Sequence, residues 1–269
     1  IYMNSLYNKF RYFNPPVLIY LIPPSLITGP FLPDLLLTIT GIFFLIKIVY
    51  EKKLFYFNNI FTKLFLFFYS IIILSSFLSG DILFSLESSL FYFRYLFFCI
   101  AIYYCIERYN NFLKKVFQSF FITCIFIIFD SYFQWYFGYN ILGWNIHTQT
   151  RLTSFFGEEM ILGSFFSRII PIMFMCYIIH KKNINNRNII FILGFTLLVI
   201  ALVFRSGERA ALGYVLIFYF YLLFIFKKNI IITFTSFILL ISLSLSIIYF
   251  NQTKNRVIYY VLVICFYTF

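Results

Sequence analysis

Charged residues are scarce in this sequence. Only 11% of its 269 residues are Asp, Glu, Lys or Arg, whereas 62% are hydrophobic. A soluble domain has about 25% charged and about 45–50% apolar residues. A soluble fold of this length could not bury so much apolar surface, so we expect the excess to face lipid.

Acidic residues are scarcer still, because nine Asp and Glu stand against 21 Lys and Arg and give a net charge of +12. Binding to nucleic acid would require a clustered basic face. Here the positive residues lie in short runs between apolar stretches, which is typical of the cytoplasmic loops of membrane proteins. We therefore expect membrane lipids, and no nucleic acid, around this chain.

Several motifs that would define other classes of protein are also lacking. The five cysteines all lie in apolar segments without the spacing of metal ligands, so we expect neither a disulfide framework nor a metal site. The absence of Walker A, GxGxxG and HExxH motifs argues against an ATP-driven pump, a dinucleotide enzyme and a zinc protease. No cofactor and no cleavable signal peptide are expected.

What the sequence has is long apolar runs. A helical span needs about 20 mostly apolar residues, and continuous rather than alternating runs favour helices over the strands of a barrel. We predict an all-α, polytopic transmembrane bundle in a single domain, residues 1–269, whose prolines make the first two spans kinked or a tight hairpin. The nine predicted spans are 17–32, 35–50, 60–79, 89–106, 116–137, 161–179, 189–204, 210–226 and 230–250.

The positive residues predict the orientation of these spans. Two-thirds of the 21 Lys and Arg residues fall in the N-terminal flank and in alternate loops. By the positive-inside rule that side is cytoplasmic, so the N-terminus is predicted to be cytoplasmic as well.

The remaining positive residues break this rule. Two lie inside spans, Arg94 and Arg168, and five lie on the external side: Arg151, Arg205, Arg209, Lys254 and Arg256. They either snorkel to outer headgroups or form an anion site. Arg209 falls at the start of the eighth span, where free N–H groups and the helix dipole favour an anion. Two or three guanidinium groups at one membrane surface would suit a diphosphate.

Polar residues inside the spans form a second candidate group. Arg94, Asp130 and Arg168 are all expected in the outer third of the membrane, and Asp130 shares a helix face with Gln134 at spacing i, i+4. We predict an ion pair of Asp130 with Arg94 or Arg168, because charges in hydrocarbon are costly and usually face the protein interior. The pair would be either structural or the floor of an outward-facing cavity.

Two acidic residues, Glu158 and Glu159, precede the sixth span. Either could neutralise Arg151, act as a base, or cap the helix N-terminus, and capping is the favoured interpretation. His147 in the same external loop is interpreted as an ordinary loop histidine.

Four segments together resemble the O-antigen ligases and O-antigen polymerases. They read SLFYFRYLFF (89–98), DSYFQWYFGYNILG (130–143), RLTSFFGEEMILGSFFSRIIPIMF (151–174) and RSGERAALGYVL (205–216). Their order and their predicted membrane sides match the family pattern, and the resemblance runs from about residue 85 to residue 256.

This resemblance implies a function on the periplasmic face of the bacterial inner membrane. It implies a glycosyltransferase that moves glycan from undecaprenyl diphosphate to lipid A–core, as the ligases do, or to another lipid-linked repeat unit, as the polymerases do. The family's two diphosphate-binding arginines correspond by motif to Arg151 and Arg209, with Arg205 as a further candidate. Glu208 stands where the family has Ser.

One departure concerns the catalytic base. In the ligases a histidine lies in a large periplasmic loop after a span like the predicted ninth, and the resemblance places that loop beyond Phe269. We therefore expect a chain that is incomplete at its C-terminus and that lacks its catalytic base. The alternatives are a transporter or flippase for a lipid-linked or anionic solute, or a scaffold without chemistry. A transporter should show inverted repeats and polar groups near the midplane of the membrane. This sequence shows no repeat, and its polar groups are biased toward the outer side, which favours the enzyme.

Overall fold

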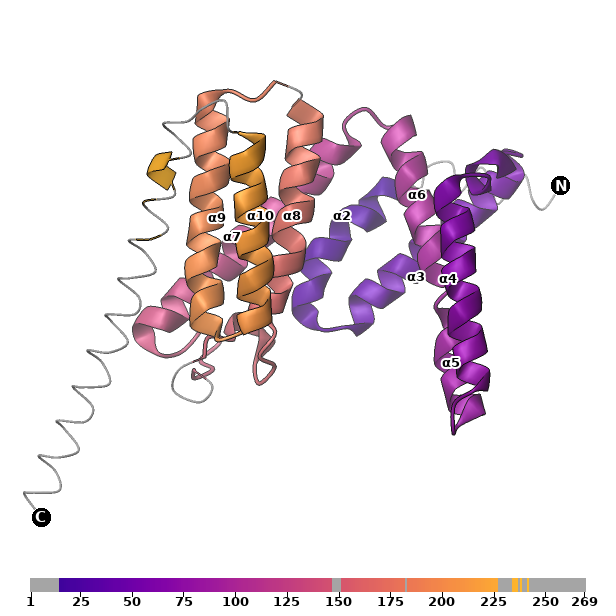
Figure 1. Cartoon of the computed structure of the whole chain (residues 1–269), viewed down its shortest axis with the longest axis horizontal. Helices are drawn as coiled ribbons and strands as arrows, with labels where there is room; N and C mark the ends of the chain where they lie inside the picture. The colour runs from indigo at the N-terminus through magenta and orange to yellow at the C-terminus, as the bar shows by residue number, and fades with distance from the viewer. Residues whose placement is uncertain are drawn as a thin grey trace, which may run out of the picture. The chain divides into compact units, whose positions relative to one another are not determined.

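The computed structural model describes residues 15–146, 151–181, 183–226, 234–236, 238 and 241, and the regular elements in these ranges are all helices (Figure 1). The predicted all-α class is therefore confirmed. The α-helices are α2 (Pro15–Ser25), α3 (Phe31–Tyr50), α4 (Ile60–Phe77), α5 (Ile82–Phe91), α6 (Arg94–Arg108), α7 (Phe112–Phe137), α8 (Leu162–Lys181), α9 (Asn186–Ser206) and α10 (Arg209–Ile225). Three short 3₁₀ helices are η1 (Leu26–Thr28), η2 (Leu54–Phe57) and η3 (Ser154–Phe156).

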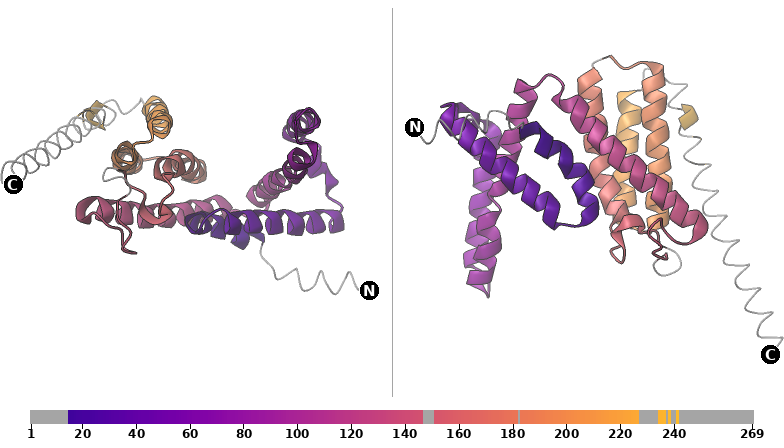
Figure 2. Two further views of the ribbon diagram at one scale, coloured as in Figure 1. Left: turned by 90° about the horizontal axis from the view of Figure 1, so that it is seen from below. Right: turned by 180° about the vertical axis from the view of Figure 1, so that it is seen from behind.

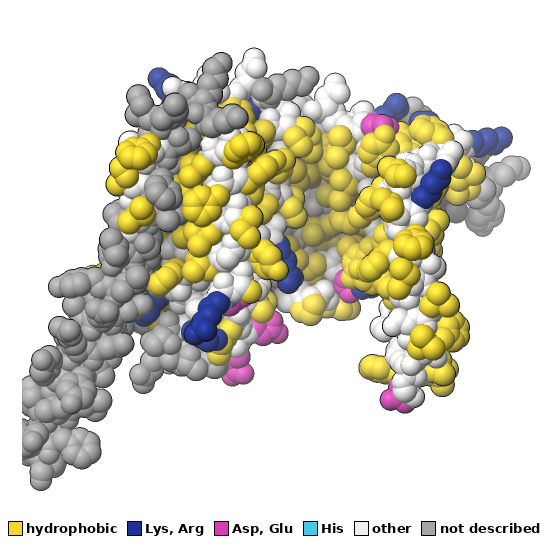
Figure 3. Space-filling view, in the orientation of Figure 1, with side chains coloured by type: hydrophobic (Ala, Val, Ile, Leu, Met, Phe, Trp, Pro, Cys, Tyr) yellow, Lys and Arg dark blue, Asp and Glu magenta, His cyan; other side chains and the backbone are white. Residues whose placement is uncertain are grey.

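Six helical segments are long and apolar enough to cross a membrane. They are Phe31–Tyr50, Ile60–Phe77, Ile82–Arg108, Phe112–Phe137, Leu162–Lys181 and Asn186–Ser206. Large apolar side chains are exposed along them and beside them, for example Leu78 at 88% and Leu83 at 87%, and hydrophobic side chains cover most of the face seen in Figure 3. Such a surface is stable only in lipid, so the chain is a multi-pass helical membrane protein.

The observed helices refine the predicted spans. Six predicted spans coincide with α3, α4, α7, α8, α9 and α10, and α10 is an apolar helix shorter than the six segments above. The first is shorter than predicted, because α2 ends at Ser25 after Pro23 and Pro24. Most of the ninth predicted span, 230–250, lies outside the described residues. The span count of nine and the cytoplasmic N-terminus stay predictions.

The chain divides into two units, residues 1–123 and 124–269. In the first unit, α2 and α3 pack against each other as the predicted hairpin, which Figure 2 shows from behind. The turn between them is closed by Gly29, whose φ of 106° is readily adopted only by glycine. α3 also packs on α6, and α4 packs on α5.

The predicted fourth span differs in one respect. Its helical segment begins at Ile82 rather than residue 89, and its regular α-helical hydrogen bonding is interrupted at Tyr92 and Phe93, whose dihedral angles stay helical. Arg94 is therefore the first residue of α6 rather than a residue in the middle of a continuous helix. There its Nη2 lies 2.6 Å from the Asp34 carboxylate in the first turn of α3.

In the second unit, α8, α9 and α10 pack side by side (Figure 1). α9 is the most buried of the six candidate spans. Its middle is apolar on every face, which is typical of a central helix. The helix ends at Gly207, whose left-handed conformation, φ 76°, turns the chain into α10.

We predict that Gly41→Leu weakens the packing of α3 on α6. A Cβ at Gly41 would lie 3.2 Å from the Cβ of Phe97, so a larger side chain must force the helices apart. The expected loss is about 1–3 kcal/mol of stability, measured as a lower unfolding temperature in detergent. Gly194→Leu is the matched control, because a Cβ there meets no atom within 4 Å. Equal effects of both variants would contradict the prediction.

Candidate functional site

A carboxylate joins the start of α8 to the turn between α9 and α10. Oε1 of Glu208 accepts a hydrogen bond from the backbone N–H of Gly163 at 2.6 Å. Oε2 accepts from the N–H of Ser164 at 2.9 Å and from the Ser164 hydroxyl. These amides are among the donors that a helix N-terminus leaves without an intrahelical acceptor, and the helix dipole also favours a negative charge there. We call this contact the Glu208 clamp.

Gly163 makes the clamp possible. A Cβ at this position would lie 2.8 Å from the Ser206 hydroxyl oxygen and 2.9 Å from Oε1 of Glu208. Both distances are shorter than real Cβ contacts, so a side chain at position 163 would displace the Ser206 hydroxyl and the Glu208 carboxylate. The glycine therefore leaves room for the Glu208 carboxylate to reach the start of α8.

Arg151 makes a second contact with the same turn. Its side chain lies along Gly207, where an added Cβ would be 3.1 Å from the Arg151 Nε. Its Nη1 donates a hydrogen bond to Sδ of Met160 at 3.1 Å. Arg151 is exposed, and so is Arg209 at the first position of α10. The segments 151–174 and 205–216 thus interlock at two points, and each presents an exposed arginine.

Buried polar groups of α7 hold the chain that precedes this junction. Oδ1 of Asp130 accepts from the N–H of Ile141 at 2.9 Å, and Oδ2 accepts from the Ser154 hydroxyl. Oε1 of Gln134 accepts from the N–H groups of Thr153 and Ser154, at 3.1 Å and 2.8 Å. Ser154 has a φ of 52°, which is unusual for a residue other than glycine. Such a conformation persists where its surroundings over-determine it, as they do here.

Asn140 extends this network into the loop after α7. Its Oδ1 accepts from the N–H of Trp144 at 2.7 Å, and its Nδ2 donates to the carbonyl of Ser154 at 2.9 Å. Tyr139 and Asn145 form an antiparallel bridge in the same loop. Residues 138–146 are therefore a tight hairpin that is attached to the segment leading to α8.

The predicted ion pair of Asp130 with Arg94 or Arg168 is wrong. The Asp130 carboxylate is occupied by Ile141 and Ser154, and Arg94 pairs with Asp34 instead. The physical reason is that a backbone amide and a hydroxyl from the returning loop satisfy the buried carboxylate without a cation.

The prediction that Glu158 or Glu159 caps α8 is also wrong. Both side chains are exposed, and Glu208 binds the amides of the second and third residues of the helix, Gly163 and Ser164. His147 lies outside the described residues.

Arg205 differs from Arg151 and Arg209 in its surroundings. It is 8% exposed, and its guanidinium lies 6.0 Å from the ring centre of Trp135. This placement favours a role in packing α9 against α7. The exposed pair, Arg151 and Arg209, is therefore the better candidate for binding an anion.

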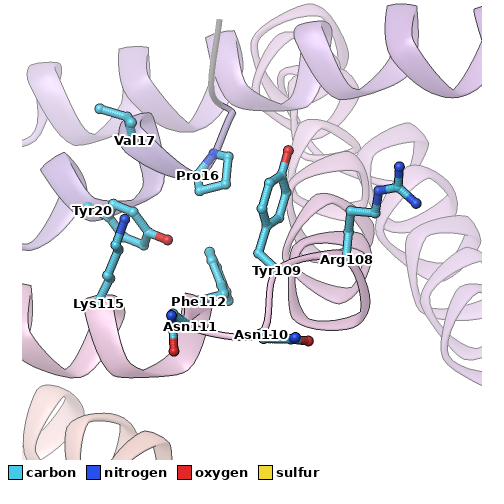
Figure 4. A pocket seen from close by; sticks show the side chains of 9 residues that line it. All are labelled: Pro16, Val17, Tyr20, Arg108, Tyr109, Asn110, Asn111, Phe112 and Lys115. Carbon is cyan, nitrogen blue, oxygen red and sulfur yellow. The ribbon is translucent and has the colours of Figure 1, made fainter.

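A separate basic pocket of about 350 Å³ lies in the first unit, between α2 and the α6–α7 connection (Figure 4). Nζ of Lys115 lies 5.8 Å from the ring centre of Tyr20, and burial raises the pKa of Tyr109. Arg108 points away from the other labelled side chains in Figure 4. The side chains around this pocket pack α2 against α7, and none belongs to the interlocked segments.

Sequence reasoning missed four residues of the junction: Asn140, Ser154, Gly163 and the clamping role of Glu208. The one sequence signal for Glu208 was its position in the polar turn RSGER, directly after Gly207. No sequence signal indicated that its carboxylate would bind a helix 45 residues away.

Comparison of the chain with protein-family models, with curated proteins and with solved structures finds no match.

We predict that Glu208→Ala destabilises the junction. The change removes a charged acceptor from the amides of Gly163 and Ser164, which should cost about 2 kcal/mol. The effect should appear as a lower unfolding temperature in detergent and as faster amide exchange at the start of α8. Glu158→Ala removes an exposed carboxylate from the loop that precedes α8 and is the control. If both variants behave alike, the clamp does not stabilise the junction.

Proposed function

We propose that this protein is a membrane glycosyltransferase of the O-antigen ligase and polymerase type. It would transfer glycan from undecaprenyl diphosphate to lipid A–core or to a lipid-linked repeat unit, on the periplasmic face of the inner membrane. The observation that supports this proposal best is the interlocking of segments 151–174 and 205–216. These are the two segments in which the sequence resembles the diphosphate-binding motifs of that family.

The exposed arginines suit the chemistry of the donor. A guanidinium binds phosphate oxygens through two parallel hydrogen bonds, and Arg151 and Arg209 would provide two such groups at one junction. Arg209 is also the first residue of α10, where free N–H groups favour an anion. Cations fixed at the diphosphate would stabilise the negative charge that develops on this leaving group as the glycan is transferred.

The fixed loop supports the same proposal. Electrostatic stabilisation is effective when the charged groups are held in place before the reaction. Arg151 lies two residues before Thr153, whose N–H is bound by Gln134. The Glu208 clamp likewise holds the turn before Arg209. Each arginine is therefore next to backbone with a tertiary hydrogen bond, and this chain would contribute donor binding and leaving-group stabilisation.

The test is glycan transfer by the purified protein in lipid vesicles that contain a labelled undecaprenyl-diphosphate glycan and a lipid acceptor. Arg151→Ala and Arg209→Ala should each slow transfer by about 10²–10³-fold, as is typical when one preorganised donor is removed. Arg151→Lys should recover only part of the rate, because lysine keeps the charge but loses the two parallel hydrogen bonds.

Arg187→Ala is the matched control, because Arg187 is an exposed arginine of the same unit at the opposite end of α9. Its rate should stay within about twofold of the unmodified protein. Binding of undecaprenyl diphosphate, measured separately from transfer, should weaken in the two alanine variants. Unchanged binding in both variants would remove the arginine pair from the proposed site.

A further inference from the structure

A groove runs between α8 and α10 in the second unit. Its volume is about 710 Å³, within the range of about 300–1,000 Å³ that is usual for small-molecule sites. The residues that line it are Ser164, Ser167, Arg168, Pro171, Ala210, Ala211, Tyr214, Ile217, Phe218 and Tyr221. Arg151, Arg205 and Arg209 are not among them, so the groove is distinct from the proposed diphosphate site.

Arg168 is the one charged residue in this lining. It is the seventh residue of α8, roughly 9 Å along the helix from Leu162 at about 1.5 Å per residue. Its side chain is exposed, and among the described residues it has no hydrogen bond and no ion pair. An arginine at such a depth is costly unless an anion neutralises it or the side chain reaches the interface. The groove therefore offers an uncompensated positive charge to a ligand.

The α10 wall of the groove is apolar and faces outward. Tyr214, Ile217 and Tyr221 follow at helical spacing on one face, and they are 65%, 68% and 48% exposed. The small side chains of Ala210 and Ala211 lie at the start of this wall and leave room beside α8. An apolar wall of about three helical turns with a cation beside it matches a hydrocarbon chain that ends in a phosphate.

We propose that this groove binds one anionic phospholipid of the surrounding bilayer, with its phosphate on Arg168 and an acyl chain along Tyr214, Ile217 and Tyr221. A lone guanidinium matches the single negative charge of a phosphodiester. The undecaprenyl diphosphate of the proposed reaction carries more charge and would leave part of it unneutralised here. The apolar wall would be unused by a free phosphate ion. The proposal does not depend on transfer activity.

The test measures lipid retention on the purified full chain by native mass spectrometry, with phosphatidylglycerol and phosphatidylcholine of identical chains. The unmodified protein should retain one phosphatidylglycerol and bind it at least tenfold more tightly than phosphatidylcholine. Arg168→Gln should abolish that preference. Arg168→Lys should keep most of it, because an ammonium also binds phosphate as a point charge. Arg187→Gln, an exposed arginine outside the groove, should leave the preference unchanged.

A second variant tests the groove while Arg168 stays in place. Ile217→Trp fills the apolar wall with an apolar side chain and should weaken phosphatidylglycerol binding at least fivefold. Leu198→Trp is its control, since Leu198 is exposed on α9 outside the groove.

Three results would overturn the proposal. The first is equal retention of the two lipids by the unmodified protein. The second is retention of phosphatidylglycerol by Arg168→Gln. The third is displacement of phosphatidylglycerol by undecaprenyl phosphate at equal or lower concentration, which would assign the groove to an isoprenoid carrier. Loss of the proposed transfer activity in Arg151→Ala has no bearing on any of these readouts.

Discussion

The Glu208 carboxylate is the interaction on which the second unit depends most. It satisfies two free amides at the start of α8 from a turn that is 45 residues away in sequence. Gly163 leaves room for this contact, and the left-handed Gly207 forms the turn that carries Glu208. Without it, the start of α8 would lose its anionic partner, and the turn between α9 and α10 would lose its attachment. This carboxylate also lies next to Arg209, the first residue of α10.

A second constraint acts on the loop between α7 and α8. Asp130 and Gln134 lie on one face of α7, and both use their oxygens to bind backbone or hydroxyl groups of the returning chain. Burying a polar group is costly unless it is hydrogen-bonded, and a loop returning to a helix needs partners for its own amides. The side-chain oxygens of Asp130 and Gln134 accept the hydrogen bonds that the loop amides and hydroxyl donate, so both sets of polar groups are satisfied. The intramembrane polar residues therefore shape the loop backbone instead of forming a charge pair.

The helices were largely predictable, because about 20 apolar residues in a row leave few alternatives. The partners of the polar residues were not. Spacing i, i+4 showed that Asp130 and Gln134 share a face, but it contains no information on which loop returns to that face. The break at Tyr92 and Phe93 was equally invisible, because both residues are apolar and neither is Gly or Pro. Arg94 follows this interruption and pairs with Asp34, which the sequence did not indicate either.

The arginines that break the positive-inside rule show that counting misplaced charges in the sequence overestimates the number of residues in an anion site. In sequence they share one anomaly, a positive charge outside the predicted cytoplasmic loops. In space the anomaly has several causes: Arg94 is neutralised by Asp34, Arg205 packs over Trp135, and Arg168 faces an apolar groove. Arg151 and Arg209 are exposed and belong to the two segments joined at the Glu208 clamp. Among the described residues Glu208 accepts hydrogen bonds from the α8 donors and forms no ion pair with either arginine, which is compatible with the proposed anion site.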